Sequence, residues 1–289
     1  MKDLYVVAGV SKQACHQHRI RQLQNQATTA KFFEQANRIR KEHSKQGCRK
    51  MALDLRCSGW GRDKTERWLL EHGYRVYYPP NFTRTTFSQQ HLLYPNLIEG
   101  LELTAINQLV QTDITYYRVG DRFYYLVFLI DVYSRRIVGY AVNKTLEAEG
   151  NVRALQKLFK TRQKHCLAGM IHHSDRGSQY IDKTYTGLLK ERTIQISMSK
   201  EAWQNAYSER VNRTIKEEYL DGWTIKNYQQ LSQCVAKAVS HYNHKRRHQS
   251  LQYLTPVQFE RLMENNTIDQ TPKMTLYNHL DYYPQNGCE

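Results

Sequence analysis

The sequence is short of closely spaced cysteines and of long apolar stretches. Its 6 cysteines form no Cys-x-x-Cys pair, so neither a zinc knuckle nor a thioredoxin-like redox motif is indicated. Their scattered spacing fits reduced thiols in a cytosolic protein. No stretch approaches the roughly 20 apolar residues of a membrane-spanning helix. The short apolar stretch from Leu4 to Val10 is followed by basic and polar residues, so we interpret it as a helix rather than a signal peptide. We expect a soluble, cytoplasmic protein.

Acidic residues are also scarce relative to basic ones. Lys and Arg number 42 against 27 Asp and Glu, which leaves a formal net charge of +15 over 289 residues. A surplus of that size attracts polyanions, of which nucleic acid is the commonest. A ribosomal-type binder or a merely soluble basic protein would share this composition. The length allows one core of about 150 residues and a smaller module.

Residues 1–78 are basic and show no strand alternation before Tyr74, which indicates a helical region. Ser11 suits an N-cap position, because its hydroxyl can accept a hydrogen bond from a first-turn amide. Short helices joined by tight turns containing Gly are what a helix-turn-helix needs, and an ordinary helical bundle is the alternative. The expected helices are Leu4–Gly9, Ser11–Gln24, Thr29–His43, Arg49–Leu55 and Lys64–His72. Basic residues that could meet DNA phosphates are Arg19, Arg21, Arg38, Arg40, Arg49 and Lys50.

Residues 79–96 form a Pro- and Thr-rich connector without apolar periodicity, which indicates a linker. Residues 97–262 then follow an α/β pattern, with the order β-β-β-α-β-α-β-α-α and helices on the faces of a mixed sheet. The first three strands must be antiparallel, because a parallel crossover needs a dozen or more residues. We assign no structure to the polar tail, residues 263–289. The expected strands are 110–117, 123–133, 136–142, 168–173 and 194–198, and the expected helices are 147–162, 183–192, 205–220 and 228–246.

Three acids lie where a metal-dependent phosphoryl-transfer site could form. Asp113 stands within the first strand, where an acid is unfavourable unless something compensates it. Asp175 directly follows the fourth strand, and ligands usually bind at the ends of such strands. Glu209 lies early in the next-to-last helix. Singly, they could be a strand-edge charge, a turn former and half of a surface pair with Arg213. Asp131 competes with Asp113, and the residues alone do not separate the two.

Five ordered motifs resemble the DDE transposases of bacterial insertion sequences, which share the catalytic core of retroviral integrases. The likeness covers roughly residues 95 to 260 and is greatest to the insertion-sequence-three family, specifically the product of its second reading frame. The motifs are TDITY at 112–116, DVYSRRIVGY at 131–140, HSDRGSQY at 173–180, NAYSER at 205–210 with Lys216, and Tyr242-Asn243 with Arg247, His248, Leu251 and Pro256.

This resemblance implies an RNase H-like core in which Asp113, Asp175 and Glu209 are the catalytic residues and the metal ligands. Asp131 then becomes a framework residue near the site. The implied cofactor is a pair of Mg²⁺ ions, for which Mn²⁺ could substitute. Lys216 follows Glu209 by two helical turns and corresponds to a basic residue that touches terminal DNA, a solvated lysine being the alternative. The expected contacts to nucleic acid are Asn205, Arg210, Arg213, Lys216, Lys245, Arg246 and Arg247.

The chain also departs from the family pattern. Thirty-three residues, 176 to 208, separate the last two acids, whereas the family usually has 35. Gln204 stands where the family often has an aspartate, and Leu109-Val110-Gln111 replaces a usual tryptophan. The shorter loop could displace the helix that carries Glu209 and so reduce activity. The histidine–cysteine zinc module of retroviral integrases has no counterpart in this sequence.

Two further groups of residues allow two interpretations each. His172 and His173 precede Asp175 closely and could assist it, although a histidine at a strand end is more often structural. Six tyrosines between positions 116 and 140 could stack on flipped bases, but strands favour tyrosine in any case.

The resemblance implies a transposase that works in two steps. Water cleaves a phosphodiester at an insertion-sequence end, and the freed 3′-hydroxyl attacks another phosphodiester; the family copies the element out through a circular intermediate. The expected partners are double-stranded DNA (terminal inverted repeats and target), further copies of the chain, and a helix-turn-helix protein from an upstream frame, fused or separate. Such a protein would associate with the bacterial nucleoid. The alternatives are an RNase H-like nuclease that cuts without joining, and a catalytically impaired basic DNA-binding protein.

Overall fold

The computed structural model describes residues 11–55, 60–77, 94–265 and 273–276. The chain divides into two compact units, residues 1–79 and 80–289, and each is described by itself. The expected helix at Leu4–Gly9 and most of the expected linker lie outside the described residues. Within the described ranges, no helix has both the length and the apolar character needed to cross a membrane.

The N-terminal unit is helical, as expected. Its helices are α2 (Lys12–Glu42), α3 (Cys48–Asp54) and α4 (Arg62–Glu71). The predicted N-cap is confirmed, since the Ser11 hydroxyl accepts from the amide of Ala14 at 3.1 Å. The prediction of two helices within residues 11–43 is wrong, because α2 runs through without a break. The segment between them, Asn25-Gln26-Ala27-Thr28, contains no Gly or Pro to end a helix.

The core of this unit forms where the second half of α2 packs on α3 and α4. Phe32 and Ala36 of α2 meet Met51 of α3 and Leu69 of α4, all fully buried. Arg40, expected as a phosphate contact, instead braces the unit internally. Its guanidinium donates to the carbonyl oxygens of three residues beyond α2, at 2.7–3.1 Å: Ser44, Gln46 and Tyr74.

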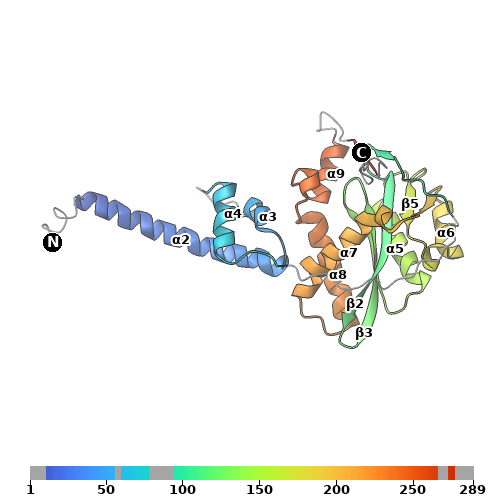
Figure 1. Cartoon of the computed structure of the whole chain (residues 1–289), viewed down its shortest axis with the longest axis horizontal. Helices are drawn as coiled ribbons and strands as arrows, with labels where there is room; N and C mark the ends of the chain where they lie inside the picture. Colours follow the sequence, from blue (N-terminus) through green and yellow to red (C-terminus); the bar gives the residue numbers. More distant parts are fainter. Residues whose placement is uncertain (1–10, 56–59, 78–93, 266–272, 277–289) are drawn as a thin grey trace, which may run out of the picture. The chain divides into compact units, whose positions relative to one another are not determined.

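The C-terminal unit is built on a five-stranded mixed sheet in the order β4-β3-β2-β5-β6 (Figure 1). The predicted antiparallel meander of three strands is confirmed, and β2 then pairs in parallel with β5, as β5 does with β6. This order and these directions are those of the expected RNase H-like core. The strands are β2 (Leu109–Val119), β3 (Arg122–Asp131), β4 (Ile137–Asn143), β5 (Ile171–Ser174) and β6 (Gln195–Met198).

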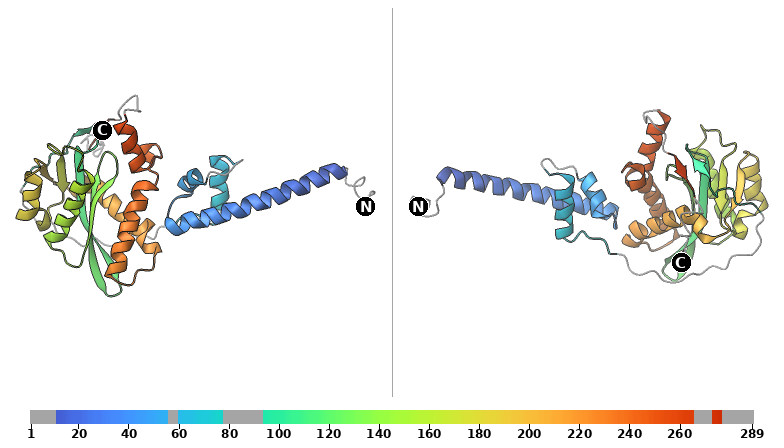
Figure 2. Two further views of the ribbon diagram at one scale, coloured as in Figure 1. Left: turned by 180° about the vertical axis from the view of Figure 1, so that it is seen from behind. Right: turned by 45° about the horizontal axis from the view of Figure 1, so that its top comes forward.

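Helices cover both faces of the sheet, and β3 shows how the sequence arranges this. Val127 and Leu129 face the layer that contains α5 and α6, whereas Leu126, Phe128 and Ile130 face α7 and α8, as the two-residue period of a strand requires. Figures 1 and 2 show α6 and α8 on opposite sides of the sheet. The helices are α5 (Ala148–Thr161), α6 (Lys183–Lys190), α7 (Ala206–Glu218) and α8 (Tyr228–His244).

One glycine fixes how closely α5 approaches the sheet. A Cβ atom on Gly139 of β4 would lie 2.3 Å from the carbonyl oxygen of Ala154 in α5. No side chain fits there, so glycine permits this contact between backbones.

A further helix and a short strand pair close one end of this unit, and we did not predict them. Helix α9 (Pro256–Glu264) begins with a capping box, in which Thr255 and Gln258 exchange hydrogen bonds. Strand β1 (Glu102–Leu103) pairs antiparallel with β7 (Met274–Thr275). The tail beyond residue 262 was assigned no structure, yet it contributes β7 and the buried Leu276. Short 3₁₀ turns lie at Ser178–Tyr180, Ala202–Asn205, Leu220–Gly222 and Gln249–Leu251.

Candidate active site

Asp113 lies in the middle of the central strand β2, half-buried beneath α7. The backbone amide of Ile114 donates to its Oδ1 at 2.9 Å, and the side-chain amide of Asn212 donates to its Oδ2 at 2.9 Å. Both carboxylate oxygens therefore have a fixed direction before any ligand arrives.

Asp175 reaches the same place from the neighbouring parallel strand. The last paired position of β2 and β5 is Gln111 with His173, and each aspartate stands two residues beyond that pair. Residues two apart share one face of a strand, which brings the two acids together where β5 ends. The amide of Gly177 donates to Asp175 Oδ1 at 3.0 Å and closes the turn that follows.

Glu209 comes from the first turn of α7 and is exposed. The pKa of Asp113 is raised to about 7. Burial is the largest cause, and the negative charges of Asp175 and Glu209 follow. Burial also raises the pKa of Asp175. Asp175 and Glu209, both remote from Asp113 in sequence, thus lie close enough to it to oppose its ionisation.

The shortened loop before α7 is fastened to β2 at the two positions where the sequence departs from the family. Gln111 of β2 donates to the backbone oxygen of Gln204 at 2.9 Å, and its own side-chain oxygen accepts from the amide of Tyr207 at 3.3 Å. The Gln204 side chain in turn accepts from the amides of Lys200 and Glu201. The start of α7 is therefore held to the strand that carries Asp113.

The two histidines before Asp175 belong to a buried polar layer beneath the site. His172 Nε2 pairs with the hydroxyl of Tyr185 at 2.7 Å, and His173 Nδ1 pairs with that of Ser197 at 2.8 Å. Burial lowers the pKa of His172 to about 4 and that of His173 to about 3, so both are neutral near pH 7. This environment favours the structural interpretation of the pair.

Asp131, the alternative to Asp113 as the first catalytic acid, differs from it in its hydrogen-bond and ion-pair partners. Its carboxylate accepts from the amides of Asn107 and Ser134 at 2.7 and 3.0 Å and lies 3.3 Å from Arg162. Arg162 is only 2 % exposed and also bridges to the equally buried Glu260 at 2.5 Å. Asp131 is thus compensated inside an ion network and has no open face for a ligand.

The expected DNA contacts fall into two groups. Arg210, Arg213 and Lys245 are exposed, and Lys216 lies half-buried with its ammonium 2.9 Å from the hydroxyl of Thr115. These positions leave the predicted contacts open.

The side chains of the second group are engaged inside the protein. Asn205 is buried and its amide donates to the backbone oxygen of Thr112 at 2.9 Å. The guanidinium of Arg246 forms two 2.6 Å hydrogen bonds with the Glu218 carboxylate. These internal bonds give both side chains a structural role, and their contacts to DNA stay predictions. Arg247 donates to the backbone oxygen of Tyr253 at 3.1 Å. A basic sequence run does not distinguish an arginine that anchors a helix from one that faces solvent.

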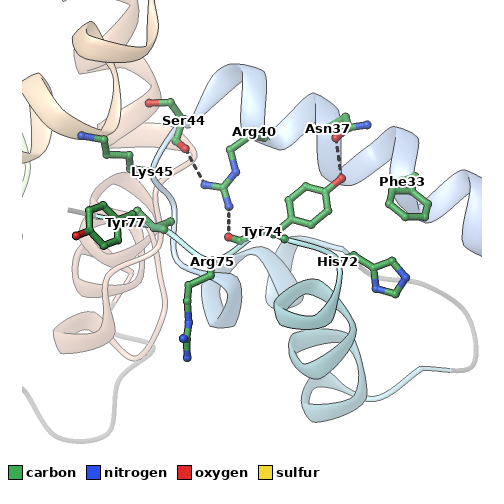
Figure 3. A pocket seen from close by; sticks show the side chains of 11 residues that line it. Phe33, Asn37, Arg40, Ser44, Lys45, His72, Tyr74, Arg75 and Tyr77 are labelled. Carbon is green, nitrogen blue, oxygen red and sulfur yellow. Dashed lines mark hydrogen bonds between the residues drawn. The ribbon is translucent and has the colours of Figure 1, made fainter. Parts of the chain in front are cut away.

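The N-terminal unit has a hollow of about 550 Å³ (Figure 3). Arg40, Lys45, Arg75 and His72 lie among its lining residues, which include no acid. The side chain of Tyr77 at its rim is 83 % exposed. Without a carboxylate the hollow does not suit a divalent cation, but its charge suits an anion.

Asn212 was not among the residues we selected, although it touches Asp113. It follows Glu209 by three positions in a helix, a spacing that places two side chains on neighbouring parts of one face. That spacing is the signal that could have identified it.

Comparison with known proteins shows to which family the chain belongs. The integrase core domain family matches residues 104–202, and a second integrase core domain family matches residues 191–256. The chain is 32% identical to the insertion element IS600 31 kDa protein of Shigella sonnei, over 74% of this chain and 80% of that protein. It is 34% identical to the transposase for insertion sequence element IS904 of Lactococcus lactis, over 58% of this chain and 67% of that protein.

Among solved structures, the catalytic core domain of HTLV-2 integrase is similar with a TM-score of 0.45 and 17% identity, covering 57% of this chain and 99% of that one. The relatives and the matched family agree with the resemblance of the motifs. The chain belongs to the bacterial insertion-sequence transposases with an integrase core domain, which are DDE polynucleotidyl transferases.

Proposed function

We propose that Asp113, Asp175 and Glu209 are the catalytic residues of this transposase and that they hold divalent cations during DNA cleavage and strand transfer. The observation that carries this proposal is geometric: Asp113 and Asp175 each lie two residues beyond the last paired position of the adjacent strands β2 and β5. Glu209 lies close enough for its charge, with burial and the charge of Asp175, to raise the pKa of Asp113 to about 7. Such an arrangement is unfavourable in the protein alone, and a cation among the three acids would reverse it.

The donor set fits Mg²⁺. All three side chains offer carboxylate oxygens, which hard cations prefer, and Mg²⁺ is commonly bound by few carboxylates together with waters and substrate phosphates. We propose two Mg²⁺ ions per site, with Mn²⁺ able to replace them. When bound, such ions activate the attacking oxygen and stabilise the leaving oxygen of an in-line displacement.

Backbone and side-chain amides of this chain orient the carboxylates. The amides of Ile114 and Asn212 aim the carboxylate of Asp113, and the amide of Gly177 aims that of Asp175. Strands and a helix are more precise supports than loops for such groups. In the cleavage step, water attacks a phosphodiester and a 3′-oxygen leaves. In the transfer step, that 3′-hydroxyl attacks a second phosphodiester. Each step forms one P–O bond as another breaks, so no covalent enzyme–DNA intermediate is needed.

DNA would be held beside these acids by the basic face of α7. Arg210, Arg213 and Lys216 follow Glu209 by one, four and seven residues along the helix, so the last two lie on the side of the glutamate. The ammonium of Lys216 donates to a neutral hydroxyl, that of Thr115, and lies 5.8 Å from the centre of the Tyr116 ring, and neither group carries a negative charge. We propose that these side chains and Lys245 contact phosphates of the insertion-sequence end.

The N-terminal unit would supply a second contact to DNA. Its hollow is lined by Arg40, Lys45 and Arg75 without an acid (Figure 3). Because Arg40 is bound to backbone carbonyls, the exposed Arg75 is better placed to meet phosphates. The working form would be an oligomer on paired DNA ends, alone or with a helix-turn-helix protein from an upstream frame.

A strand-transfer assay tests the proposal. Oligonucleotides that carry the ends of the element are incubated with the full chain and Mg²⁺, and cleaved and joined products are separated by size. Joined products support the transposase. Cleavage without joining would identify a nuclease, and binding without either would identify a DNA-binding protein that has lost its chemistry. Asp175→Asn should abolish both products while DNA binding survives, and full activity in that variant would refute the site.

A further inference from the structure

Three hydrogen bonds attach helix α7 to strand β2, and a side chain of β2 accepts each of them. We call this series of three the ladder. Gln111 accepts from the amide of Tyr207 at 3.3 Å, Asp113 from Asn212 at 2.9 Å, and Thr115 from Lys216 at 2.9 Å. The three strand residues share one face, spaced about 6.7 Å apart. The partners advance by five and then four residues, a rise of about 6–7.5 Å along a helix. The helix therefore runs in step with the strand.

Asn212 forms the middle contact of this ladder, and that contact joins the two chain segments that carry the first and last acids. Asn212 is 5 % exposed, so its amide replaces water at Asp113 Oδ2. It follows Glu209 by three residues. A shift of α7 along the strand would therefore break the hydrogen bond to Asp113 and displace Glu209 at the same time.

The bonding of Asn212 differs from that of Asn243, another buried asparagine of the same unit. Asn243, also buried, has both of its polar groups satisfied, since it accepts from the amide of Ile137 and donates to its carbonyl at 2.9 and 2.8 Å. The Oδ1 of Asn212 is buried and has no hydrogen-bond partner among the described residues. A buried acceptor left in this state costs free energy unless a ligand or water reaches it.

We propose that Asn212 is a positioning residue for the cation site: it aims the carboxylate of Asp113 and sets the distance of Glu209 from it. The inference rests on the proposed function, because it takes these acids as the cation ligands. Hydrogen bonds behind a metal ligand commonly contribute 10- to 100-fold to metal affinity. Loss of the Asn212 amide should weaken Mn²⁺ binding by about that factor, without any DNA present.

Mn²⁺ binding to the full chain, followed by the electron paramagnetic resonance of the free ion, measures this directly. Two variants remove the amide: Asn212→Ala, and Asn212→Leu, which keeps the side-chain volume in case alanine destabilises the packing. Asn243→Ala is the matched control, because it removes a buried asparagine remote from the acids. Thermal unfolding of each variant in EDTA separates stability from ion binding. We expect both Asn212 variants to bind Mn²⁺ about 10- to 100-fold more weakly and Asn243→Ala to bind as the wild type does, despite its lower melting temperature.

The outcomes separate this inference from the proposed function. If the wild type binds no more Mn²⁺ than Asp113→Asn, the cation site itself is refuted. If the wild type binds Mn²⁺ and both Asn212 variants match it, the cation site stands and the role of Asn212 is refuted. If Asn243→Ala weakens binding as much as the Asn212 variants do, lost stability explains the effect, and the positioning role is likewise overturned.

Discussion

Two aspartates on adjacent strands, the half-buried Asp113 of β2 and the buried Asp131 of β3, have opposite surroundings. Asp131 lies against Arg162, and the neighbouring Glu260 is bound by both Arg162 and Arg136. Asp113 instead faces two further acids. Both positions are acids in apolar strand sequence, so their sequence setting does not distinguish them. What distinguishes them is whether the protein itself supplies the opposite charge.

The same contrast appears in the causes of their pKa shifts. Burial is the largest cause for both and raises both values. For Asp131 the next cause is the charge of Arg162, which lowers the pKa. For Asp113 the next causes are Asp175 and Glu209, which raise it further. An acid compensated within the fold stabilises structure, whereas an acid that lies beside two like charges, as Asp113 does, is suited to a cation from outside.

The largest expected effect comes from neutralising the uncompensated acid. Asp113→Asn should reduce strand transfer by roughly 10³-fold or more, because a ligand to the catalytic ions contributes several kcal/mol to transition-state stabilisation. The variant should fold as well as the wild type, since it removes repulsion. Product formation at saturating Mg²⁺ measures the effect. Asp121→Asn, in an exposed pair with Arg118, is the control and should keep normal activity; a comparable loss there would contradict the assignment.

Breaking the ion network of Asp131, Arg162 and Glu260 should reduce stability rather than catalysis. Arg162→Met leaves Asp131 and Glu260 buried without their shared cation, a change that typically costs about 3–5 kcal/mol. Urea unfolding of the metal-free protein gives the difference. Arg118→Met removes an arginine from an exposed ion pair and should change stability by less than about 1 kcal/mol. Equal effects of the two substitutions would mean that burial of the network does not matter.

The sequence could predict the framework of this fold but not this contrast. Alternating apolar residues and turns too short for a crossover were enough for the antiparallel meander of β2, β3 and β4. Arg162, which compensates Asp131, is 31 residues away in the chain, where no local pattern points to it. The family motifs were therefore needed to choose Asp113 rather than Asp131 as the catalytic acid. The structure adds the physical reason, which is that Asp131 is paired with Arg162.

The errors in the helical and terminal regions have local causes. Helix α2 was predicted as two helices, although the segment between them contains no helix-breaking residue. Helix α9 was missed although Thr255, Pro256 and Gln258 form a recognisable start signal. Strands β1 and β7 are two residues long, too short to give any alternation. The internal partners of Asn205 and Arg246 could not be predicted, because tertiary contacts are invisible in sequence.

A smaller effect should appear in the pH dependence of stability without metal. The pKa of Asp113 is raised from 3.8 to about 7 in the folded protein. Below pH 4 the carboxyl is protonated in both states, so it has no effect. Between about pH 4 and 7 the unfolded state ionises first, and the folded wild type loses up to roughly 4 kcal/mol relative to Asp113→Asn. Above pH 7 the loss is complete.

Urea unfolding of both proteins in EDTA from pH 4 to 8 gives this difference, and saturating Mg²⁺ at pH 7.5 should reduce it. A difference that does not vary with pH would mean that the Asp113 carboxyl is ionised throughout, and that its neighbours do not oppose its charge.

The smallest expected effect extends the comparison to basic residues. Arg246 is compensated by Glu218, whereas Arg213 is exposed on α7. If compensation marks structural charges, Arg213→Ala should weaken DNA binding modestly and lower the slope of log affinity against log salt by about 1, the value for one lost phosphate contact. Arg246→Ala should lower the melting temperature and leave that slope unchanged, because its guanidinium meets a carboxylate rather than DNA. Fluorescence anisotropy between 50 and 300 mM salt, at a temperature where both variants are folded, compares them. If the slope falls for Arg246→Ala and not for Arg213→Ala, an arginine with an internal carboxylate partner still binds DNA phosphates. An internal partner would then not identify a structural charge, and the contrast between Asp113 and Asp131 would lose its explanation.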